Sequence, residues 1–394
     1  MAEVHGHCDP RFSTLKTLLS SNIASGVDIG ASICVNLDGE DVVDIWAGHT
    51  DSNRSTPWSK DTIVNVWSTT KTVTSLAAFI LVERGQLDLE ENVATYWPEF
   101  GANGKENVKV KHILSHTSGV SGFEEKVSFE DICDHEKSIG LLEKQRLWWE
   151  PGTKSGYHAM TMGHLVGEVV RRITGKPLKQ FVAEEIAGPL GADFQIGAKE
   201  EDWDRIATLI PPPPPPKRKI SRDSVLFKTM GNPVLDARRA LTPLWRGADM
   251  GGANGHGNAR SVVRMLSPMS LGGKVKGLDK PLLSPETINL VFNEQAYGQD
   301  LVIGEEGPLR WGTGFALGGP DTIHAWLPQG RVFFWCGWGG SVITMDLDRK
   351  LTISYTMNKM ELGTLGGPRT HAYVLAVYRA LGVPLPGEIP AAKL

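Results

Sequence analysis

A serine and a lysine three positions apart open one of the most apolar stretches of this chain. Ser68 and Lys71 lie in the run 66–71, and residues 72–82 are mostly apolar. The spacing of the apolar residues predicts a buried helix that ends at Gly85, with Ser68 in its first turn. Because residues three apart share one face of a helix, the hydroxyl and the amine should lie together.

Such a pair has the chemistry of a nucleophile and its base. Burial lowers the pKa of a lysine by disfavouring its charged form, so Lys71 could accept the proton of Ser68 near neutral pH. The helix N-terminus adds a partial positive charge and free N–H groups beside the oxygen. The same spacing recurs at Ser13 and Lys16, where polar residues flank the pair. Since so short a motif often arises by chance, the apolar context is what distinguishes Ser68.

The composition argues against several other classes of function. The chain has 394 residues and is 41% apolar, which is enough for a deep hydrophobic core. Its net charge is −4, so it has no surplus of basic residues. We therefore expect no nucleic-acid partner, and no apolar run is long enough to indicate a membrane partner. The 11 histidines form no compact ligand set, so we expect neither a metal site nor a cofactor. The Gly-x-Ser-x-Gly motif of the α/β-hydrolases is absent.

The first eight residues contain no apolar signal core, which predicts a cytoplasmic protein. Its cysteines show no paired spacing, so we expect reduced thiols. These cysteines are Cys8, Cys34, Cys133 and Cys336.

Strand patterns at both ends of the chain enclose a mostly helical middle. The fold class that this order predicts is α/β (α+β): one antiparallel sheet built from both termini and flanked by helices, with an inserted helical region. We expect a sheet domain of residues 1–66 and 285–394 and a helical domain of residues 67–284, with the active site at their junction. Helices are predicted at 12–23, 72–84, 109–115, 161–175, 177–187 and 370–381, and strands at 31–37, 41–46, 332–336, 341–346 and 351–357.

Six consecutive prolines occupy positions 211–216, and Lys217, Arg218 and Lys219 follow them. Such a run predicts an extended, exposed segment. It is either a rigid surface connection, which we favour, or a ligand for a proline-binding domain.

Two further motifs carry groups that acyl transfer needs. Tyr157 lies on a loop rich in Pro and Gly just before a predicted helix, and a nearby lysine ammonium would favour its phenolate for proton shuttling. Gly339 and Gly340 interrupt the strand region, as glycines do where a backbone or a ligand approaches closely. The N–H of Ser341 could then pair with that of Ser68 as an oxyanion hole. Alternatively, Tyr157 has only a structural role, and the two glycines form a simple β-bulge.

Four segments in this order resemble motifs of the serine β-lactamase and penicillin-binding-protein superfamily, nearest to family VIII carboxylesterases and lovastatin-type acyltransferases. They are 61–71, 113–120, 151–157 and 338–340, and the resemblance runs from about 11 to 385. It implies a β-lactamase/transpeptidase-like fold in which Ser68 is acylated while Lys71 and Tyr157 share the acid–base work. It also implies that the backbone N–H groups of Ser68 and Ser341 hold the oxyanion, and that His116 is structural.

Two departures from the family pattern bear on the substrate. Class C β-lactamases carry Tyr-x-Asn, whereas this chain has Ala159 at the position of the asparagine. They also carry Lys-Thr-Gly, whereas residues 338–340 of this chain are Trp-Gly-Gly. A site that loses a cation and gains an indole should prefer neutral, apolar acyl groups. The glycine-rich segment 251–258 is expected as a loop at the rim of the site. The candidate substrate-binding residues are Trp338, Gly339, Gly340, His158 and Trp311.

The function predicted is that of a serine carboxylesterase, which hydrolyses neutral and fairly apolar small-molecule esters through a Ser68 acyl-enzyme. The first alternative is an acyltransferase that passes the acyl group, supplied by an ester or an acyl carrier, to an alcohol of a small secondary-metabolite-like acceptor. Less favoured are a β-lactamase or D-peptidase and a non-catalytic binding protein. Hydrolysis and acyl transfer to an alcohol would use the same catalytic residues, so the sequence does not decide between an esterase and an acyltransferase.

Overall fold

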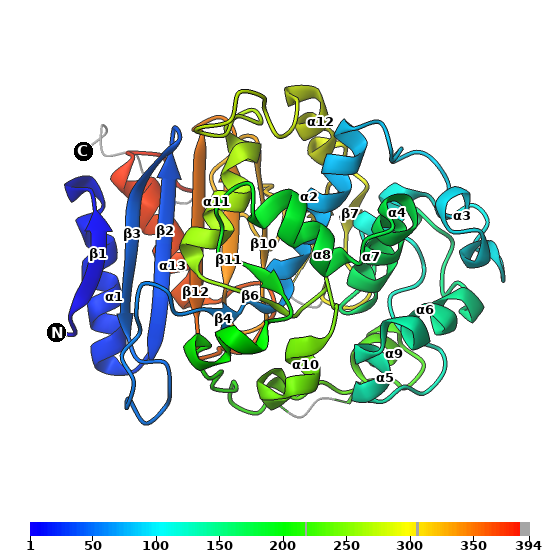
Figure 1. Ribbon diagram of the computed structural model, residues 1–394, viewed down its shortest axis with the longest axis horizontal. Coiled ribbons are helices and arrows are strands. Elements are labelled where there is room, and N and C mark those ends of the chain that lie inside the picture. The colour runs from blue at the N-terminus through cyan, green and yellow to red at the C-terminus, as the bar shows by residue number, and fades with distance from the viewer. Residues whose placement is uncertain (217–218, 305–306, 387–394) are drawn as a thin grey trace.

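The two ends of the chain meet in one antiparallel sheet of the computed structural model, which describes residues 1–216, 219–304 and 307–386 (Figure 1). Its strands follow the order β1-β3-β2-β12-β11-β10-β9-β8-β7. The predicted fold class is therefore confirmed. The strands are β1 (Val4–Cys8), β2 (Gly30–Leu37), β3 (Glu40–Gly48), β7 (Ala296–Gly298), β8 (Leu309–Trp311), β9 (Ala316–Leu317), β10 (Val332–Cys336), β11 (Val342–Asp346) and β12 (Leu351–Met357).

Most helices lie between the two groups of strands, as predicted. A second, small sheet in the same region has the order β4-β6-β5, with β4 (Val64–Asn65), β5 (Gln195–Ile196) and β6 (Gly255–Gly257). The helices are α1 (Ser13–Ser25), α2 (Thr70–Glu83), α3 (Val93–Tyr96), α4 (Val110–Leu114), α5 (Phe129–Cys133), α6 (His135–Lys144), α7 (Thr161–Thr174), α8 (Leu178–Val182), α9 (Val225–Met230), α10 (Pro243–Gly247), α11 (Ala259–Ser270), α12 (Pro285–Asn289) and α13 (Pro368–Ala380).

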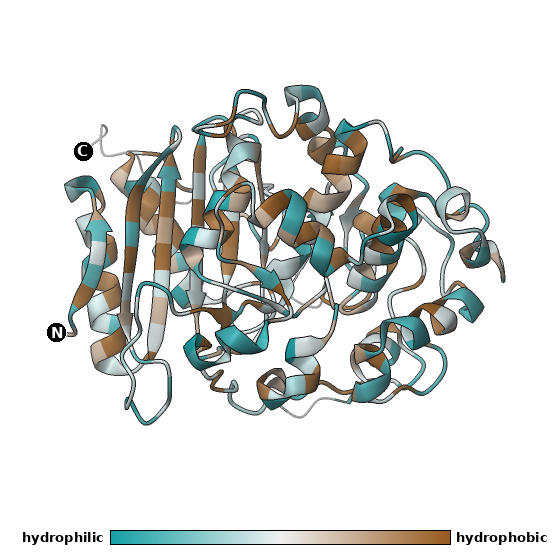
Figure 2. Cartoon of the chain, viewed as in Figure 1, coloured by the Kyte–Doolittle hydropathy of each residue, from teal (hydrophilic) through white to brown (hydrophobic). Residues whose placement is uncertain are grey.

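The alternation of residues along the strands decides which helix covers each face of the large sheet (Figure 2). In β12, the large residues at alternate positions, such as Tyr355, join the hydrophobic cluster that also contains α1 and α13. The small polar residues between them face α11, where Thr352 shares a hydrogen bond of 2.8 Å with Ser270. On the neighbouring strand, Ser32 Oγ accepts the N–H of Ala259 at 3.1 Å. Helices therefore pack on both faces of the sheet.

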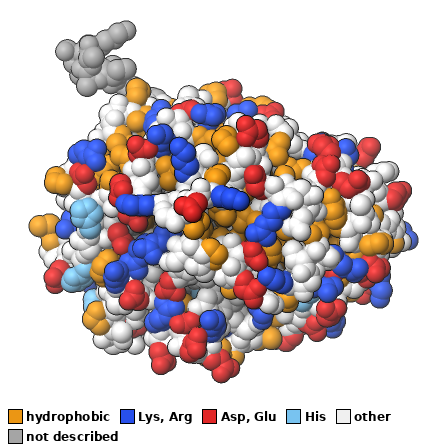
Figure 3. Space-filling view, turned by 45° about the horizontal axis from the view of Figure 1, so that its top comes forward, with side chains coloured by type: hydrophobic (Ala, Val, Ile, Leu, Met, Phe, Trp, Pro, Cys, Tyr) orange, Lys and Arg blue, Asp and Glu red, His pale blue; other side chains and the backbone are white. Residues whose placement is uncertain are grey.

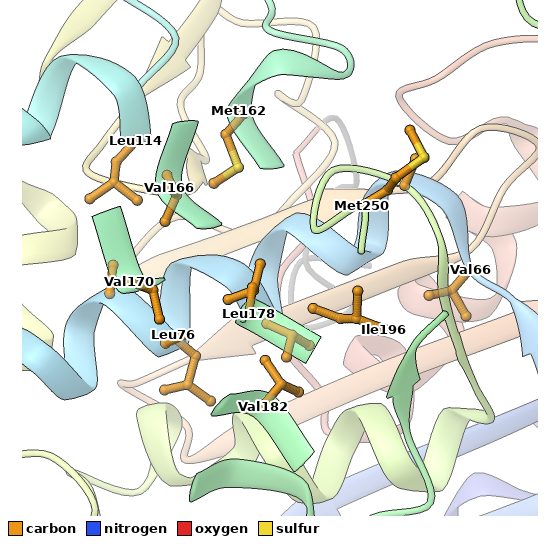
Figure 4. Close-up of a cluster of buried hydrophobic side chains, with 14 of the residues drawn as sticks. Val66, Leu76, Leu114, Met162, Val166, Val170, Leu178, Val182, Ile196 and Met250 are labelled. Carbon is orange, nitrogen blue, oxygen red and sulfur yellow. The ribbon is translucent and has the colours of Figure 1, made fainter. Parts of the chain in front are cut away.

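The core of the helical region surrounds α2, the helix that follows Ser68. Leu76 of α2 lies among side chains from three other helices, including Leu114, Val170 and Val182 (Figure 4). Nearly every residue of α2 is buried. Because close packing leaves little freedom of movement, this core fixes the helix that carries Lys71.

The predicted boundary between the two domains stays a proposal, and α11 bears on it. This helix belongs to the predicted helical domain by sequence, yet it packs against β2, β11 and β12 of the sheet. The proline run has no helix or strand and is largely exposed, whereas Lys217 and Arg218 lie outside the described residues.

Charges of both signs are interspersed on the surface that Figure 3 shows, with hydrophobic side chains between them. Within the described ranges, every helix is too short or too polar to cross a lipid bilayer.

Candidate active site

Ser68 lies in the 3-10 turn Trp67–Thr69, directly before α2, rather than in the first turn of the α-helix as predicted. Trp67 has a φ of +48°, a left-handed value that residues other than glycine seldom adopt, and the α-helix begins three residues later, at Thr70. The hydroxyl of Thr70 closes this turn by donating to the carbonyl of Trp67 at 2.5 Å. Ser68 keeps only 8% of its surface exposed. The strained turn thus presents the candidate nucleophile, Ser68, at the edge of a buried helix.

Lys71 lies in the first turn of α2 and is 2% exposed. Its Nζ is 3.3 Å from Ser68 Oγ and donates to the carbonyls of Ala159 at 2.7 Å and Gly252 at 2.6 Å. Burial lowers the pKa of this amine well below its ordinary value, and no carboxylate compensates for the lost solvation. In contrast, Ser13 of the other Ser-x-x-Lys copy is exposed.

The glycine-rich segment 251–258 is buried, so its predicted place at the rim is wrong. Gly251 accepts a hydrogen bond from Thr74 of α2 at 2.7 Å, and the carbonyl of Gly252 holds Lys71. A Cβ on Gly163 of α7 would lie 2.0 Å from the backbone nitrogen of Gly252. These glycines allow α7, α2 and the segment to approach closely beneath Lys71.

Tyr157 meets Ser68 from the loop that precedes α7. Its hydroxyl lies near enough to Ser68 for that hydroxyl to lower the pKa of the phenol, and it accepts the indole N–H of Trp335 at 3.2 Å. Nζ of Lys71 lies 4.8 Å from the centroid of the Tyr157 ring. Burial nevertheless raises the pKa of Tyr157 above its ordinary value, because desolvation of a phenolate outweighs these hydrogen bonds. The prediction that the phenolate is favoured is therefore wrong, and Tyr157 rests as a neutral phenol.

A buried carboxylate that the sequence did not reveal supports this tyrosine. Asp300 is 3% exposed; its Oδ1 accepts the backbone N–H of Tyr157 at 3.0 Å, and its Oδ2 accepts the indole N–H of Trp311 at 3.3 Å. The ring of Trp311 stacks on Tyr157 with 6° between the planes, and Trp311 is 1% exposed. Trp311 thus lies behind the tyrosine, where it supports the ring. A lone aspartate before the apolar run 301–303 is the only local signal of this role.

The two histidines near the site have inward-facing contacts. The ring of His158 bonds to Ser118 Oγ and to the carbonyl of Gly156, both at 2.6 Å, and burial lowers its pKa to about 3. His158 therefore has no ring nitrogen left for a substrate. The backbone N–H of His158 donates to Nδ1 of His116 at 3.1 Å. Such contacts fit the structural role that the family resemblance implies for His116.

The turn 337–341 between β10 and β11 lies against the turn that carries Ser68. Ser341 Oγ donates to the carbonyl of Val66 at 2.8 Å and shares a hydrogen bond of 2.9 Å with Thr69 Oγ1. Trp338 is half-buried and packs edge-on against Trp67, with 4.9 Å between ring centroids. The structure thus brings Ser341 and Trp338 next to the serine turn.

Gly339 and Gly340 have φ values of +94° and +121°, which favour glycine. A Cβ on Gly339 would lie 2.6 Å from the side chain of Met360, and one on Gly340 would lie 3.1 Å from Thr370 Oγ1. What approaches the two glycines closely is therefore the chain at 360 and the first turn of α13.

The described residues contain no cluster of three side chains suited to hold a metal ion.

The sequence pattern of one family, described as Beta-lactamase, matches residues 19–378. The chain is 34% identical over 290 residues to Esterase/beta-lactamase LipL of Mycobacterium tuberculosis, covering 70% of this chain and 66% of that protein. It is 28% identical over 375 residues to Esterase EstB of Burkholderia gladioli, covering 89% and 91%. The solved structure of a family VIII carboxylesterase superposes with a TM-score of 0.89 at 36% identity, covering 96% of this chain and 100% of that one.

Proposed function

Since the chain belongs to the beta-lactamase family and is a serine hydrolase, we propose that it is a carboxylesterase that hydrolyses neutral, largely apolar esters. The observation that carries the proposal is the contact of Ser68 with both Lys71 and Tyr157. The relatives LipL and EstB are named as esterases, and both matches include more than half of this chain.

The hydrogen bonds of Lys71 suit a neutral amine that accepts a proton. A neutral amine has two N–H groups and one lone pair. Nζ donates to the carbonyls of Ala159 and Gly252 and lies 3.3 Å from Ser68 Oγ, to which its third N–H points when it is charged. Once the amine has lost that proton, its lone pair faces the hydroxyl of Ser68. Lys71 therefore acts as the general base when Ser68 attacks the ester carbonyl.

The neutral phenol of Tyr157 supplies the acid. When the tetrahedral intermediate collapses, the bond from the carbonyl carbon to the leaving oxygen breaks, and that oxygen takes a proton from Tyr157. The proton that Ser68 gave to Lys71 then passes to Tyr157 and restores its phenol. The net result is that the proton of the serine hydroxyl leaves with the alcohol. In the second half, water attacks the acyl carbon and gives a proton to Lys71. The bond from that carbon to Ser68 Oγ then breaks, and Oγ takes the proton back through Tyr157 as the carboxylic acid leaves.

The oxyanion is held by the backbone N–H groups of Ser68 and Ser341 in this proposal. Two contacts of the Ser341 side chain, with Val66 and Thr69, support it because they fix Ser341 beside the serine turn. Donors held in advance of the reaction stabilise the transition state without reorganisation.

An apolar substrate is favoured by the surroundings of the site. Trp338 stands beside the serine turn at the position where class C β-lactamases have a lysine. A groove of about 480 Å³ lies beyond the turn 337–341, where Gly363 in its wall accepts the N–H of Gly339 at 3.2 Å; Ser68 and Tyr157 are not among the described residues that line it. Most of its wall is apolar: Pro215, Pro216, Ile220, Leu226, Val302, Ile303, Leu362 and Leu365. A groove of this kind favours alkyl or aryl groups over charged ones.

Intact-mass spectrometry after brief exposure to short p-nitrophenyl esters tests the proposal. We expect one acyl group per chain on Ser68, and Ser68→Ala should abolish both this adduct and the release of p-nitrophenol. Ser13→Ala is the matched control, since it changes the serine of the other Ser-x-x-Lys copy and should leave turnover unchanged. Near-normal turnover in Ser68→Ala would reject the proposal. Adding alcohols and measuring new ester against free acid tests the acyltransferase alternative.

A further inference from the structure

The peptide that joins Gly340 to Ser341 is held from the side opposite the proposed oxyanion hole. Its carbonyl oxygen accepts a hydrogen bond of 2.7 Å from Thr370 Oγ1, and Thr370 is fully buried in the first turn of α13. In a trans peptide the C=O and the N–H point in opposite directions. A hydroxyl that fixes the carbonyl toward α13 therefore turns the Ser341 N–H away from α13.

A peptide in this place needs such a restraint. Gly339 and Gly340 both have positive φ values, and glycine accepts either sign of φ at little cost. Rotation of the Gly340–Ser341 peptide would therefore meet little resistance from the local backbone. The side chain of Ser341 is anchored to Val66, but that contact does not fix the orientation of the peptide before it.

The preceding carbonyl is held from the same helix. Arg369 donates to the carbonyl of Gly339 at 3.0 Å, and its guanidinium also donates to the buried carboxylate of Asp28 at 2.8 Å. Arg369 is 4% exposed and Asp28 is 0% exposed, so solvent does not compete for these contacts. Two successive residues of α13 thus hold two successive carbonyls of the turn.

We propose that Thr370 is a positioning residue for the oxyanion hole, which locks the peptide so that the Ser341 N–H faces Ser68. The inference rests on the proposed function and deepens it. A hydrogen bond to the carbonyl also polarises the peptide and makes its N–H a stronger donor. Since loss of one oxyanion donor costs roughly 10²–10³ in kcat, loosening one should cost about tenfold.

Thr370→Val tests the inference because it removes the hydroxyl and keeps the shape of the side chain. We expect kcat for a p-nitrophenyl ester to fall about tenfold with little change in KM, and Thr370→Ser to restore it. Thr356→Val is the matched control. Thr356 is equally buried in β12, and its hydroxyl bonds to Ser32 at 2.9 Å, away from the turn. It should lose stability without the selective fall in kcat.

Affinity for an alkyl or aryl boronic acid gives a second measurement that does not need turnover. The boron adds to the serine oxygen and forms a tetrahedral anion, so the adduct needs the oxyanion donors. We expect Thr370→Val to weaken binding by about the same factor as it lowers kcat. Should Thr370→Val not fold, Thr370→Ala replaces it, since its smaller side chain cannot clash.

Unchanged kcat and unchanged boronate affinity in a folded Thr370→Val protein would overturn the lock and leave the esterase proposal intact. Failure of the wild-type protein to hydrolyse any ester would instead overturn the esterase proposal, while the boronate measurement would still decide the role of Thr370.

Discussion

The carboxylate of Asp300 holds the backbone of Tyr157, whose N–H donates to Oδ1 at 3.0 Å. The same oxygen accepts the N–H groups of Val302 at 2.9 Å and Ile303 at 3.1 Å, and Oδ2 accepts the indole of Trp311. One buried side chain therefore connects the loop of the proposed acid, the aromatic ring behind it and the segment after Asp300. The position of the phenol beside Ser68 depends on this connection.

Removing that carboxylate should cost both stability and activity. Asp300→Ala leaves four N–H groups without their acceptor, and each buried orphan costs on the order of 1–3 kcal/mol. We expect a fall of several kcal/mol in the free energy of unfolding, measured by urea denaturation, and a lower kcat. Asp300→Asn keeps one acceptor oxygen and should lose less of both. If Asp300→Ala unfolds at the same urea concentration as the wild type, the carboxylate is not what positions Tyr157.

Local patterns in the sequence were sufficient to predict the elements around Ser68. The apolar run after Lys71 predicted a buried helix, and α2 occupies Thr70–Glu83. The Asp-Gly pair at 38 and 39, a sequence typical of tight hairpin turns, joins β2 to β3 with both residues at positive φ. The resemblance to a known family predicted the remaining part of the fold, because members of a family that share the same motifs in the same order bring those motifs together in space.

Contacts made across the fold were beyond the reach of those patterns. The carbonyl of Gly252 that holds Lys71 has no side chain to mark it, and Asp300 lies far from Tyr157 in the sequence. The protonation of Tyr157 was predicted with the wrong sign because the sequence shows the neighbouring lysine but not the loss of solvent. Burial at such a site is a property of the whole fold.

The pH dependence of the reaction should report Lys71. Its pKa is lowered by burial, and the base must be neutral to accept a proton, so kcat/KM should rise with pH through that lowered pKa and level off. No fall is expected on the alkaline side until the protein unfolds, because the pKa of Tyr157 is raised and the phenol stays protonated. A pH profile measured with an uncharged ester checks both limbs.

A second buried lysine provides the control for this assignment. Lys105 donates to the carbonyls of Ala102, Glu143 and Gln145, and burial lowers its pKa to about 8. Lys105→Met should leave the acidic limb in place wherever the protein remains folded, whereas Lys71→Met should abolish turnover. An acidic limb that moves in Lys105→Met would mean that it does not report Lys71.

A cation at position 338 should change the choice of substrate. Trp338→Lys removes an indole beside the serine turn and puts an ammonium there, so activity toward neutral apolar esters should fall while anionic acyl groups gain. The measurement is kcat/KM over a series of p-nitrophenyl esters of rising chain length. Trp46→Lys, a half-buried tryptophan of β3, is the control. If Trp338→Lys and Trp46→Lys keep the same chain-length preference, Trp338 does not line the acyl site.

Close approach of α7 to the segment that holds Lys71 makes Gly163 a sensitive glycine to test. In Gly163→Ala the new Cβ would meet the backbone nitrogen of Gly252 at 2.0 Å, so the segment must shift. Overpacking of this kind costs about 1–3 kcal/mol and would move the carbonyl that binds Lys71. We therefore expect lower stability together with a shifted acidic limb.

Gly140 of α6 offers the matched substitution, since its Cβ would meet no atom within 4 Å. Gly140→Ala should be stabilising by roughly 0.5–1 kcal/mol, because alanine loses less backbone entropy in a helix, and should leave the pH profile unchanged. Urea denaturation of both variants, with a pH profile for each, separates the two effects. Equal behaviour of the two alanine variants would show that the segment at Gly252 tolerates displacement and does not set the environment of Lys71.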